Sequence, residues 1–374
     1  MLAGVGSDSC KSDDYNMSGN TLEHVWATNG IRLIGDGVPG GDVNLARVRV
    51  KHWEEWFGYW AGRGDYYESL AREALARGRR KSAGELFWKA SLSYHYAQFL
   101  WFHDPKNRDA GQRRKVDLYR EGAPLFDMPA ERFDILFESL TIPGYLRLPR
   151  TRSGRVPVVM VLGGLESTKE ESYLFENRCL ARGLATCTFD GPGQGEMYFQ
   201  SKMRQDFHRF ASAVVDWLEK RPEIDIGRVG VLGRSLGGFY AVHCAAHDPR
   251  FKACVAWGVL FDLSYYDSMG EPSALGFAYV AGYDDRRLAA PYLKQTLNLA
   301  GTAEQVRCPV YALHGALDKL IPATQVDKLR MALADNPDVE FDMPADGDHC
   351  CHNLYHVVRP RMADWVAERL GGHV

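Results

Sequence analysis

The sequence lacks the features that would place it in a membrane, in a secretory route or on nucleic acid. No apolar run approaches the roughly 20 residues that a membrane span needs. Residues 1–20 are polar and rich in glycine and serine, without the basic start and apolar core of a secretion signal. The formal net charge is only −3, so there is no electrostatic case for nucleic acid or an anionic membrane surface. We expect a cytoplasmic protein that binds neither, with a disordered lead-in over residues 1–20.

Cysteine is also scarce, with eight residues in a chain of 374. Most of these lie inside apolar runs, as expected for reduced packing residues rather than a disulfide framework. The sequence His349-Cys350-Cys351-His352 could suggest a metal, but adjacent ligands lack the usual C-x₂₋₄-C or H-x₃₋₅-H spacing. The glycine-rich stretch 190–196 has its third glycine one residue too early for a dinucleotide loop. We therefore expect no metal and no cofactor.

Two regions of the chain differ in their hydrophobic period. Residues 21–130 place aromatic side chains at helical spacing, as at Trp53, Trp56 and Trp60, and predict an all-helical cap domain. Residues 131–374 alternate short apolar runs with amphipathic stretches, which predicts an α/β domain with a mostly parallel, doubly wound sheet. Pro143-Gly144, between two apolar pieces, predicts an antiparallel hairpin at the sheet edge. Residues 258–306 interrupt the alternation and are expected to pass over the active-site face.

The most informative motif is Gly233-Arg234-Ser235-Leu236-Gly237. It follows the apolar run 229–232 and precedes a small-residue helical run over 238–246. A strand, G-x-S-x-G and a helix in this order are typical of a nucleophile elbow, a strained turn that exposes the serine hydroxyl. We therefore expect Ser235 to be the nucleophile of an acyl-transfer site.

Two further predicted strand ends carry the partners that a serine nucleophile needs. Asp318 follows the apolar run 310–313, and His349 follows the run 339–341. The order Ser, Asp, His along the chain is the one that α/β-hydrolases use. A neutral imidazole takes the serine proton, and the carboxylate orients the ring and stabilises the imidazolium. The rival acid is Asp262, and the rival bases are His314, His352 and His356.

The oxyanion that forms on attack needs N–H donors, each contributing roughly 3–4 kcal/mol to the transition state. The backbone N–H of Leu236, at the start of the elbow helix, is the first candidate. The second is the N–H of Leu165, in the loop Gly163-Gly164-Leu165-Glu166 that follows the predicted strand 156–162. Glycines in this loop allow the backbone to approach a substrate.

With these motifs placed, the chain resembles the α/β-hydrolase family of 2,6-dihydroxypseudooxynicotine hydrolase and the fungal polyketide-shortening (naphthopyrone) hydrolases. The segments that carry the resemblance are 91–102, 162–171, 189–196, 233–238 and 346–353. The resemblance implies an α/β-hydrolase domain with an N-terminal helical cap, no metal, a homodimer, and a small aromatic or polyketide substrate. It places the triad on Ser235, Asp318 and His349.

The resemblance also implies hydrolysis of a C–C bond next to a ketone, of retro-Claisen type, in an acylated hydroxyaromatic or β-dicarbonyl substrate. The carbon that leaves must be protonated, so a general acid is needed. His349 could supply the proton; Glu271 is the additional candidate and Asp267 its reserve. Glu166, Trp257 and Tyr266 complete the expected substrate-binding residues. A carboxylesterase, a thioesterase or an acyltransferase could use the same triad, and a ligand receptor without activity is a more remote alternative.

Overall fold

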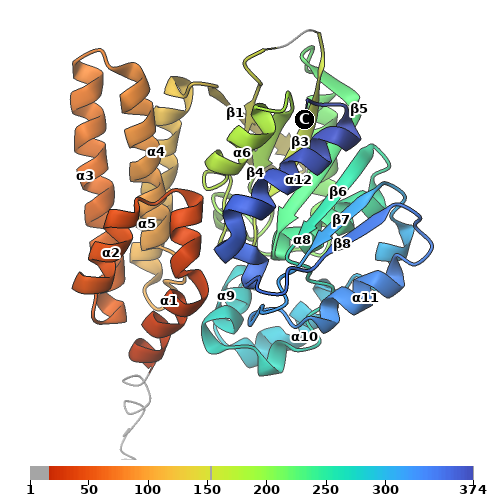
Figure 1. Cartoon of the computed structure of the whole chain (residues 1–374). Coiled ribbons are helices and arrows are strands. Elements are labelled where there is room, and N and C mark those ends of the chain that lie inside the picture. Colours follow the sequence, from red (N-terminus) through yellow and green to blue (C-terminus); the bar gives the residue numbers. More distant parts are fainter. Residues whose placement is uncertain (1–16, 152–153, 374) are drawn as a thin grey trace, which may run out of the picture.

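The N-terminal region is a bundle of helices that stands beside a larger α/β region (Figure 1). The computed structural model describes residues 17–151 and 154–373. Residues 1–16 of the expected lead-in lie outside the described residues, whereas 17–20 form the first turn of a helix. The helices of the bundle are α1 (Met17–Asp36), α2 (Gly40–Arg49), α3 (Trp56–Ala76), α4 (Arg80–Ala97) and α5 (Pro105–Gly122). No helix among the described residues is long and apolar enough to cross a membrane.

The tryptophans at helical spacing form the core of this bundle. Trp53, Trp56 and Trp60 are all buried, and the rings of Trp53 and Trp56 stack with their centroids 5.3 Å apart. The indole N–H of Trp56 donates to the carbonyl oxygen of Tyr96 in α4, at 2.6 Å. A buried indole needs such a partner for its polar edge. The aromatic stripe is therefore packing, and it joins α3 to α4.

An eight-stranded sheet forms the centre of the α/β region, in the order β1-β2-β4-β3-β5-β6-β7-β8. The pairs from β4 to β8 are parallel, and β2 is antiparallel to both β1 and β4. The sheet confirms the predicted α/β-hydrolase class. The strands are β1 (Ala130–Phe137), β2 (Leu140–Arg147), β3 (Val156–Leu162), β4 (Ala185–Phe189), β5 (Ile224–Arg234), β6 (Phe251–Trp257), β7 (Val310–Leu313) and β8 (Val339–Asp342).

The edge hairpin forms, but its turn differs from the predicted one. Phe137 pairs with Leu140, so the chain reverses at Glu138 and Ser139 rather than at Pro143-Gly144. Gly144 lies inside β2 opposite Phe133, and a Cβ there would come 2.1 Å from the Phe133 ring. The glycine therefore makes room for an aromatic ring instead of forming a turn.

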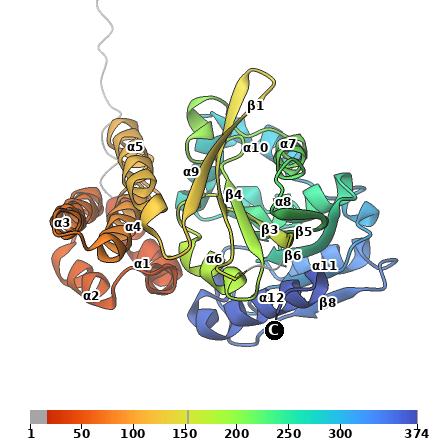
Figure 2. The same cartoon turned by 90° about the horizontal axis from the view of Figure 1, so that it is seen from above.

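Helices cover both faces of the sheet (Figure 2). One face packs against α6 (Tyr173–Leu180) and α12 (Tyr355–Leu370). The other packs against α7 (Phe207–Leu218), α8 (Leu236–His247) and α11 (Thr324–Ala332). Strands β3, β4 and β7 are buried along their whole length, as expected when helices cover both faces.

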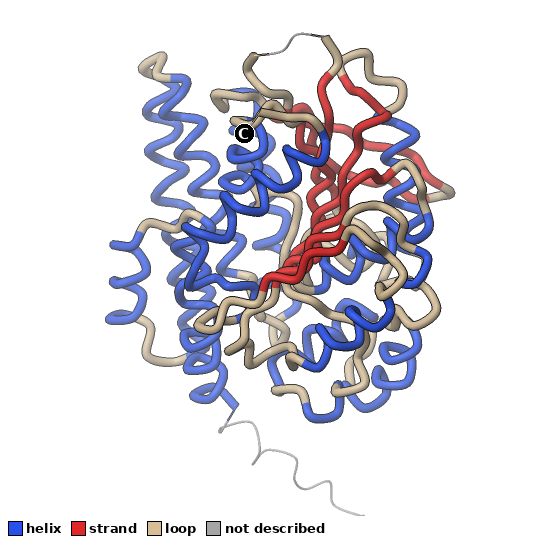
Figure 3. Tube along the Cα trace, turned by 45° about the vertical axis from the view of Figure 1, so that its right-hand side comes forward, coloured by secondary structure: helices blue, strands red, loops and turns tan. Residues whose placement is uncertain are grey.

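Residues 258–306 leave the sheet after β6 and return to it at β7. They form α9 (Glu271–Ala281), α10 (Arg286–Thr296) and the irregular segments around them. In the tube view the lower ends of the red strands lead into tan loops (Figure 3). The carboxyl ends of the parallel strands are where such sheets gather functional groups.

Candidate active site

Ser235 lies at a sharp turn between β5 and α8. Its backbone is in the left-handed region, with φ of 57° and ψ of −119°, a strain that is typical of functional turns. A Cβ on Gly233 would come 1.8 Å from the carbonyl oxygen of Gly237, and one on Gly237 would come 2.4 Å from that of Leu162. Only glycine fits at these two positions, so the motif forms the expected elbow.

Asp318 and His349 form a buried hydrogen-bonded pair. The Nδ1 atom of His349 lies 2.8 Å from Oδ2 of Asp318. The other carboxylate oxygen accepts from the backbone N–H groups of Leu320 and Ile321, at 2.8 and 2.9 Å. Burial alone would raise the pKa of Asp318, but the His349 imidazolium and these hydrogen bonds lower it. The carboxylate is therefore charged and held in place.

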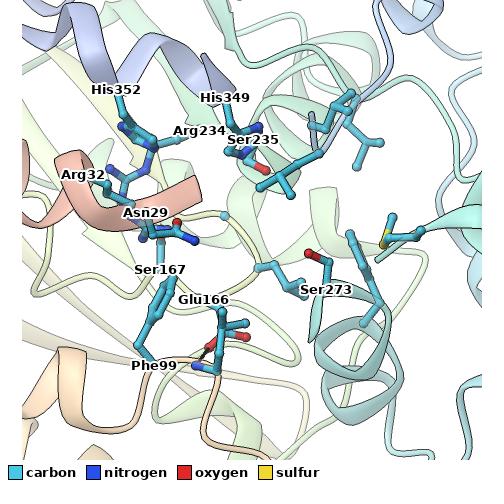
Figure 4. Close-up of a pocket in the computed structure, with 18 of the residues that line it drawn as sticks. Asn29, Arg32, Phe99, Glu166, Ser167, Arg234, Ser235, Ser273, His349 and His352 are labelled. Carbon is cyan, nitrogen blue, oxygen red and sulfur yellow. Dashed lines mark hydrogen bonds between the residues drawn. The ribbon is translucent and has the colours of Figure 1, made fainter. Parts of the chain in front are cut away.

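The environment of His349 favours its protonated form. Burial acts to lower the pKa of His349, but the Asp318 carboxylate outweighs it and holds the pKa well above its usual value. Figure 4 shows His349 next to Ser235 at one end of a cavity that both residues line. The Sγ atom of Cys350 lies 3.5 Å from Nε2 of His349. The arrangement brings together the hydroxyl, imidazole and carboxylate that the sequence singled out.

The rival residues lie elsewhere or have other partners. Asp262 is bound by Lys328, whose Nζ lies 2.7 and 2.9 Å from its two oxygens. Burial would raise the pKa of Asp262, but Lys328 and other donors lower it to about 2. His314 is buried beside Asp318 at 3.9 Å, whereas His356 is exposed on α12. His352 lines the cavity and lies near the charges of Arg234 and Arg32, which belong to a charge cluster described below.

The two candidate oxyanion donors lie on elements that touch each other. Leu236 is the first residue of α8, and the first N–H groups of a helix have no partner within it. Leu165 lines the cavity. A Cβ on Gly164 would come 2.7 Å from the carbonyl oxygen of Arg234, so the loop packs directly on the elbow. The side chain of Gln194 donates to the carbonyl oxygen of Gly163 at 2.7 Å.

Gln194 is a residue that sequence reasoning missed. It belongs to the glycine-rich stretch 190–196, which forms a tight turn in which the Gly191 N–H donates to the Gln194 side chain at 3.1 Å. What the glycine pattern did not reveal is that this turn supports the loop that carries Leu165.

Glu166 lies in the cavity, as expected. One of its oxygens accepts from the Leu100 N–H at 3.3 Å and lies 3.6 Å from the Arg108 guanidinium. The other oxygen is buried and has no hydrogen-bond partner among the described residues. Burial raises the pKa of Glu166, and the charge of Arg108 only partly opposes this shift. Burial therefore favours the protonated form of this carboxyl more than water would.

Three other expected substrate-binding residues do not reach the cavity that Ser235 lines. Trp257 lies behind the elbow, where its carbonyl accepts from the Ser235 N–H at 2.6 Å. Tyr266 is buried and donates to the carbonyl oxygen of Ala274 at 2.9 Å. Glu271 and its reserve Asp267 are largely solvated and pair with Arg286 and Lys294. The Trp257 side chain, at the end of β6, packs on the α6 and α12 face of the sheet. The excursion that follows turns the other side chains away from the cavity, which sequence spacing could not show.

The cavity has two chemically different walls. Its apolar wall comes from the α/β region and includes Leu260, Met269, Phe277, Leu320 and Ile321. Its polar wall includes Glu166, His352 and Asn29 of α1 (Figure 4). His24 of α1 also lines the cavity and lies beside Gly270. The helical bundle therefore forms part of the site, although nothing in the sequence pattern of α1 singled out these two side chains.

A neighbour of one candidate also lines the cavity. Tyr265 is part of the wall, and its hydroxyl is buried without a hydrogen-bond partner among the described residues. Sequence reasoning selected Tyr266 instead. In an irregular segment, neither a helical nor a strand period tells which of two adjacent tyrosines faces the site.

A buried charge cluster joins the helical bundle to the elbow. The carboxylate of Asp36, at the end of α1, accepts from Arg32, Tyr96, Arg234 and Arg359 at 2.7–3.2 Å. Burial acts to raise the pKa of Asp36, but the guanidinium groups hold it well below its usual value. Arg234 immediately precedes Ser235 in the chain. Residues from α1, α4, β5 and α12 thus meet next to the elbow, and Figure 4 shows two of them, Arg32 and Arg234.

Glu171 and Ser167 complete the charge cluster. Glu171 accepts from Arg32 at 2.8 Å and contacts Arg234. The Ser167 hydroxyl accepts from Arg234 at 2.9 Å. The cluster therefore contains three guanidinium groups, of Arg32, Arg234 and Arg359, and two carboxylates, of Asp36 and Glu171. The cluster thus has one more positive than negative group, and its Arg32 and Arg234 line the same cavity as Ser235.

Comparisons with known proteins agree with this geometry. The family model described as Esterase FrsA-like matches residues 49–269, and that of the dienelactone hydrolase family matches residues 194–357. The 2,6-dihydropseudooxynicotine hydrolase of Paenarthrobacter nicotinovorans is 44% identical over 341 residues, 91% of each chain. The 20-hydroxy-prefusarin hydrolase FUS2 of Gibberella moniliformis is 31% identical over 272 residues, 68% of this chain and 65% of that protein.

Solved structures show the same likeness in three dimensions. The crystal structure of 2,6-dihydroxy-pseudo-oxynicotine hydrolase matches with a TM-score of 0.85 at 43% identity, covering 91% of this chain and 95% of that one. AbyA5 matches with a TM-score of 0.73 at 18% identity over 94% of each chain, which shows a common fold. The likeness extends over both the helical bundle and the α/β region.

Proposed function

The chain belongs to the FrsA-like esterase family of α/β-hydrolases, and from this premise we propose that it is a serine hydrolase acting on a C–C bond. The substrate is an acylated hydroxyaromatic or a β-dicarbonyl compound, cleaved next to the ketone. The observation that carries the proposal is the buried pairing of His349 with Asp318 beside Ser235, in a cavity with one apolar and one polar wall. The chain is 44% identical to 2,6-dihydropseudooxynicotine hydrolase over 91% of its length, and this likeness supports the substrate class.

The first step is attack of the Ser235 hydroxyl on the ketone carbon. In its neutral form His349 takes the hydroxyl proton, and Asp318 stabilises the resulting imidazolium through Nδ1. The carbonyl oxygen becomes an oxyanion, which the N–H groups of Leu236 and Leu165 bind. The net positive charge of the cluster behind the elbow stabilises the same oxyanion over a longer range.

The second step breaks the C–C bond of the tetrahedral adduct. The electron pair passes to the leaving carbon, which tolerates it only when the charge spreads into a hydroxylated ring or an enolate. The imidazolium of His349 returns the proton to that carbon, and the acyl group remains on Ser235 as an ester. Water then attacks this ester with His349 as the base, so that one water is consumed and a carboxylic acid is released.

We assign the polar wall of the cavity to the leaving group. Glu166 carries a raised pKa and an unpartnered oxygen, so in its protonated form it donates a hydrogen bond to a hydroxyl or enolate oxygen. The apolar wall then receives the acyl chain. This orientation places polar substrate atoms against groups that would otherwise be buried and unpaired, which strongly favours a hydroxylated substrate.

The test compares an acylated resorcinol with the matching resorcinol ester. The wild-type enzyme is expected to release free resorcinol and a carboxylic acid from the ketone, and Ser235→Ala is expected to release none. Glu166→Leu is expected to lower kcat/KM for the ketone about ten- to a hundredfold, because a hydrogen bond to substrate is lost. Glu166→Gln is the matched variant that keeps a donor, and it should stay near wild type. Equal losses in both variants would contradict a donor role.

A second candidate function is ester hydrolysis, favoured by the description of the family as esterases. The same triad serves a carboxylesterase, a thioesterase or an acyltransferase, because each reaction starts with attack on a carbonyl. Rapid turnover of the ester without cleavage of the ketone would select this alternative. A receptor without activity would instead bind substrate equally well with Ser235→Ala and release no product from either compound.

A homodimer and a location in the cytoplasm are further parts of the proposal. Both rest on the sequence reasoning given above, and the substrate is expected to be a small molecule. Light scattering coupled to size-exclusion chromatography tests the first, with twice the mass of 42.1 kDa expected for the dimer. Fractionation of the native host cells tests the second.

A further inference from the structure

Three histidines gather on the helices that cover one face of the sheet, away from the cavity. His208 lies in the first turn of α7, and His243 and His247 lie one turn apart near the end of α8. One ring nitrogen from each lies within 4.8 Å of the other two. Ser235 precedes α8, so the cluster is separated from it by about 12–18 Å of helix. None of the three residues has a role in the proposed reaction.

Two of the rings carry nitrogens that lack a partner. The Nδ1 atoms of His208 and His243 are buried, and neither atom forms a hydrogen bond with any of the described residues. The side chain of His243 is almost wholly enclosed, with 7% of the residue exposed. A buried polar atom left without a partner costs free energy, so two such atoms in one cluster point to a missing ligand.

The third ring stacks on that of His208, with the centroids 3.9 Å apart, and has the tautomer that a metal ligand needs. Nδ1 of His247 lies 2.8 Å from the carbonyl oxygen of His243. A carbonyl only accepts, so this nitrogen carries the proton and the lone pair resides on Nε2. Metal-binding histidines characteristically donate their other ring N–H to a carbonyl in this way. His247 is exposed, which leaves a route from solvent.

The donor atoms of the cluster also suit a transition-metal cation. Neutral imidazoles offer the lone pair that a metal needs. The nearby carboxylate of Asp206 is occupied by Arg204, at 2.8 and 2.7 Å. The donor set is therefore nitrogen alone.

We propose that His208, His243 and His247 bind a divalent transition-metal ion of the zinc class and thereby join α7 to α8. Imidazole nitrogens suit Zn²⁺, Ni²⁺ or Cu²⁺, whereas Mg²⁺ and Ca²⁺ require oxygen ligands. The two histidines of α8 have the H-x₃-H spacing that places both on one helix face. Water completes the coordination from the exposed side. The site is structural, since it lies at the opposite end of α8 from the nucleophile.

The test is a Zn²⁺ titration of the chelator-treated full chain by isothermal calorimetry. The wild type is expected to bind one equivalent, with Mg²⁺ giving no heat. His208→Gln and His247→Gln should each weaken binding by roughly tenfold or more, the scale on which even outer-shell partners of a metal act. The matched control is His356→Gln, an exposed histidine of α12 outside the cluster, which should bind as the wild type does. Bound Co²⁺ should show the absorption of a tetrahedral nitrogen site.

Thermal unfolding supplies an independent measurement. A saturating excess of Zn²⁺ is expected to raise the Tm of the wild type by a few degrees, because only the folded chain holds the three ligands together. The His208→Gln/His247→Gln double variant should fold, retain its hydrolase activity, and show no such rise. Equal Zn²⁺ affinity in the wild type and the double variant would overturn the proposal, as would a wild-type Tm that Zn²⁺ leaves unchanged.

Discussion

Ser235 lies between two buried polar assemblies that differ in origin. The Asp318–His349 pair comes from the α/β region alone, from loops after neighbouring parallel strands. The charge cluster around Asp36 draws its members from the helical bundle, the elbow and α12. In the proposed mechanism the first assembly changes its protonation, whereas the second keeps its charges and holds the elbow. Chemistry is thus assigned to one region of the chain, and positioning to both.

Removal of the nucleophile is the largest perturbation of the first assembly. Ser235→Ala is expected to lower kcat on the order of 10⁶-fold, as loss of a catalytic serine does in other hydrolases. The fold should be unaffected, because the elbow depends on its glycines and on the Trp257 carbonyl rather than on the hydroxyl. Steady-state kinetics and circular dichroism measure the two effects. Retention of substantial ketone cleavage would remove Ser235 from the mechanism.

Replacement of the acid is the next largest perturbation, and it separates Asp318 from its rival. Asp318→Asn is expected to lower kcat about 10⁴-fold, since the His349 ring loses its orienting charge. Asp262→Asn is the matched control, because Asp262 pairs with Lys328 outside the cavity. It should change kcat by less than about tenfold. The reverse order of effects would move the acid of the triad to the β6 strand end.

These two variants probe the part of the site that sequence alone predicts well. Ser235, Asp318 and His349 each follow a strand with a clear apolar pattern, and parallel strands bring their carboxyl ends to one edge. The chain order of the three residues then selects the fold family. The β2 hairpin shows the limit: Gly144 looks like a turn residue, yet it serves to admit the Phe133 ring.

Disruption of the charge cluster around Asp36 is expected to change the free energy of unfolding more than it changes kcat. Asp36→Asn leaves three guanidinium groups facing one carboxylate in a buried site, and such a change costs about 3–5 kcal/mol of unfolding free energy. Denaturant unfolding measures this loss. The surviving folded enzyme should retain most of its kcat, because Asp36 does not contact the reacting atoms.

The control for Asp36→Asn is an exposed ion pair of the same type. Asp267 binds Lys294 at 2.6 Å, with 73% of the Asp267 side chain exposed. Asp267→Asn should cost no more than about 1 kcal/mol, because water screens the pair. Similar losses of unfolding free energy in the two variants would show that the Asp36 cluster stabilises the fold no more than an exposed ion pair does.

The charge cluster could not be predicted from the sequence. Asp36 and Arg359 are 323 positions apart, and no local period or spacing marks them as partners. The same holds for Asn29 and His24, which α1 brings into the cavity from the other region. Hydrophobic patterns place elements within a domain, but the pairing of individual charges between domains depends on how the two surfaces meet.

The mildest perturbation is a change of pH. It affects the two assemblies in opposite directions through His349 and His352, which lie three residues apart in the chain. The pKa of His349 is raised by Asp318, against the effect of burial. The pKa of His352 is lowered by burial and by the charges of Arg234 and Arg32. An unfolded histidine has a pKa of about 6.5, so the two residues titrate on opposite sides of that value.

The two histidines therefore contribute to stability in opposite pH ranges. The contribution of His349 is fully present below pH 6.5 and disappears as the pH rises through its folded pKa. The contribution of His352 is present above pH 6.5 and disappears as the pH falls, at up to about 1.4 kcal/mol per pH unit. Unfolding free energies between pH 5.5 and 7.5 should thus fall less steeply on acidification in His352→Gln than in the wild type, and more steeply in His349→Gln. A shift of both slopes in the same direction would mean that the triad and the charge cluster titrate as one assembly.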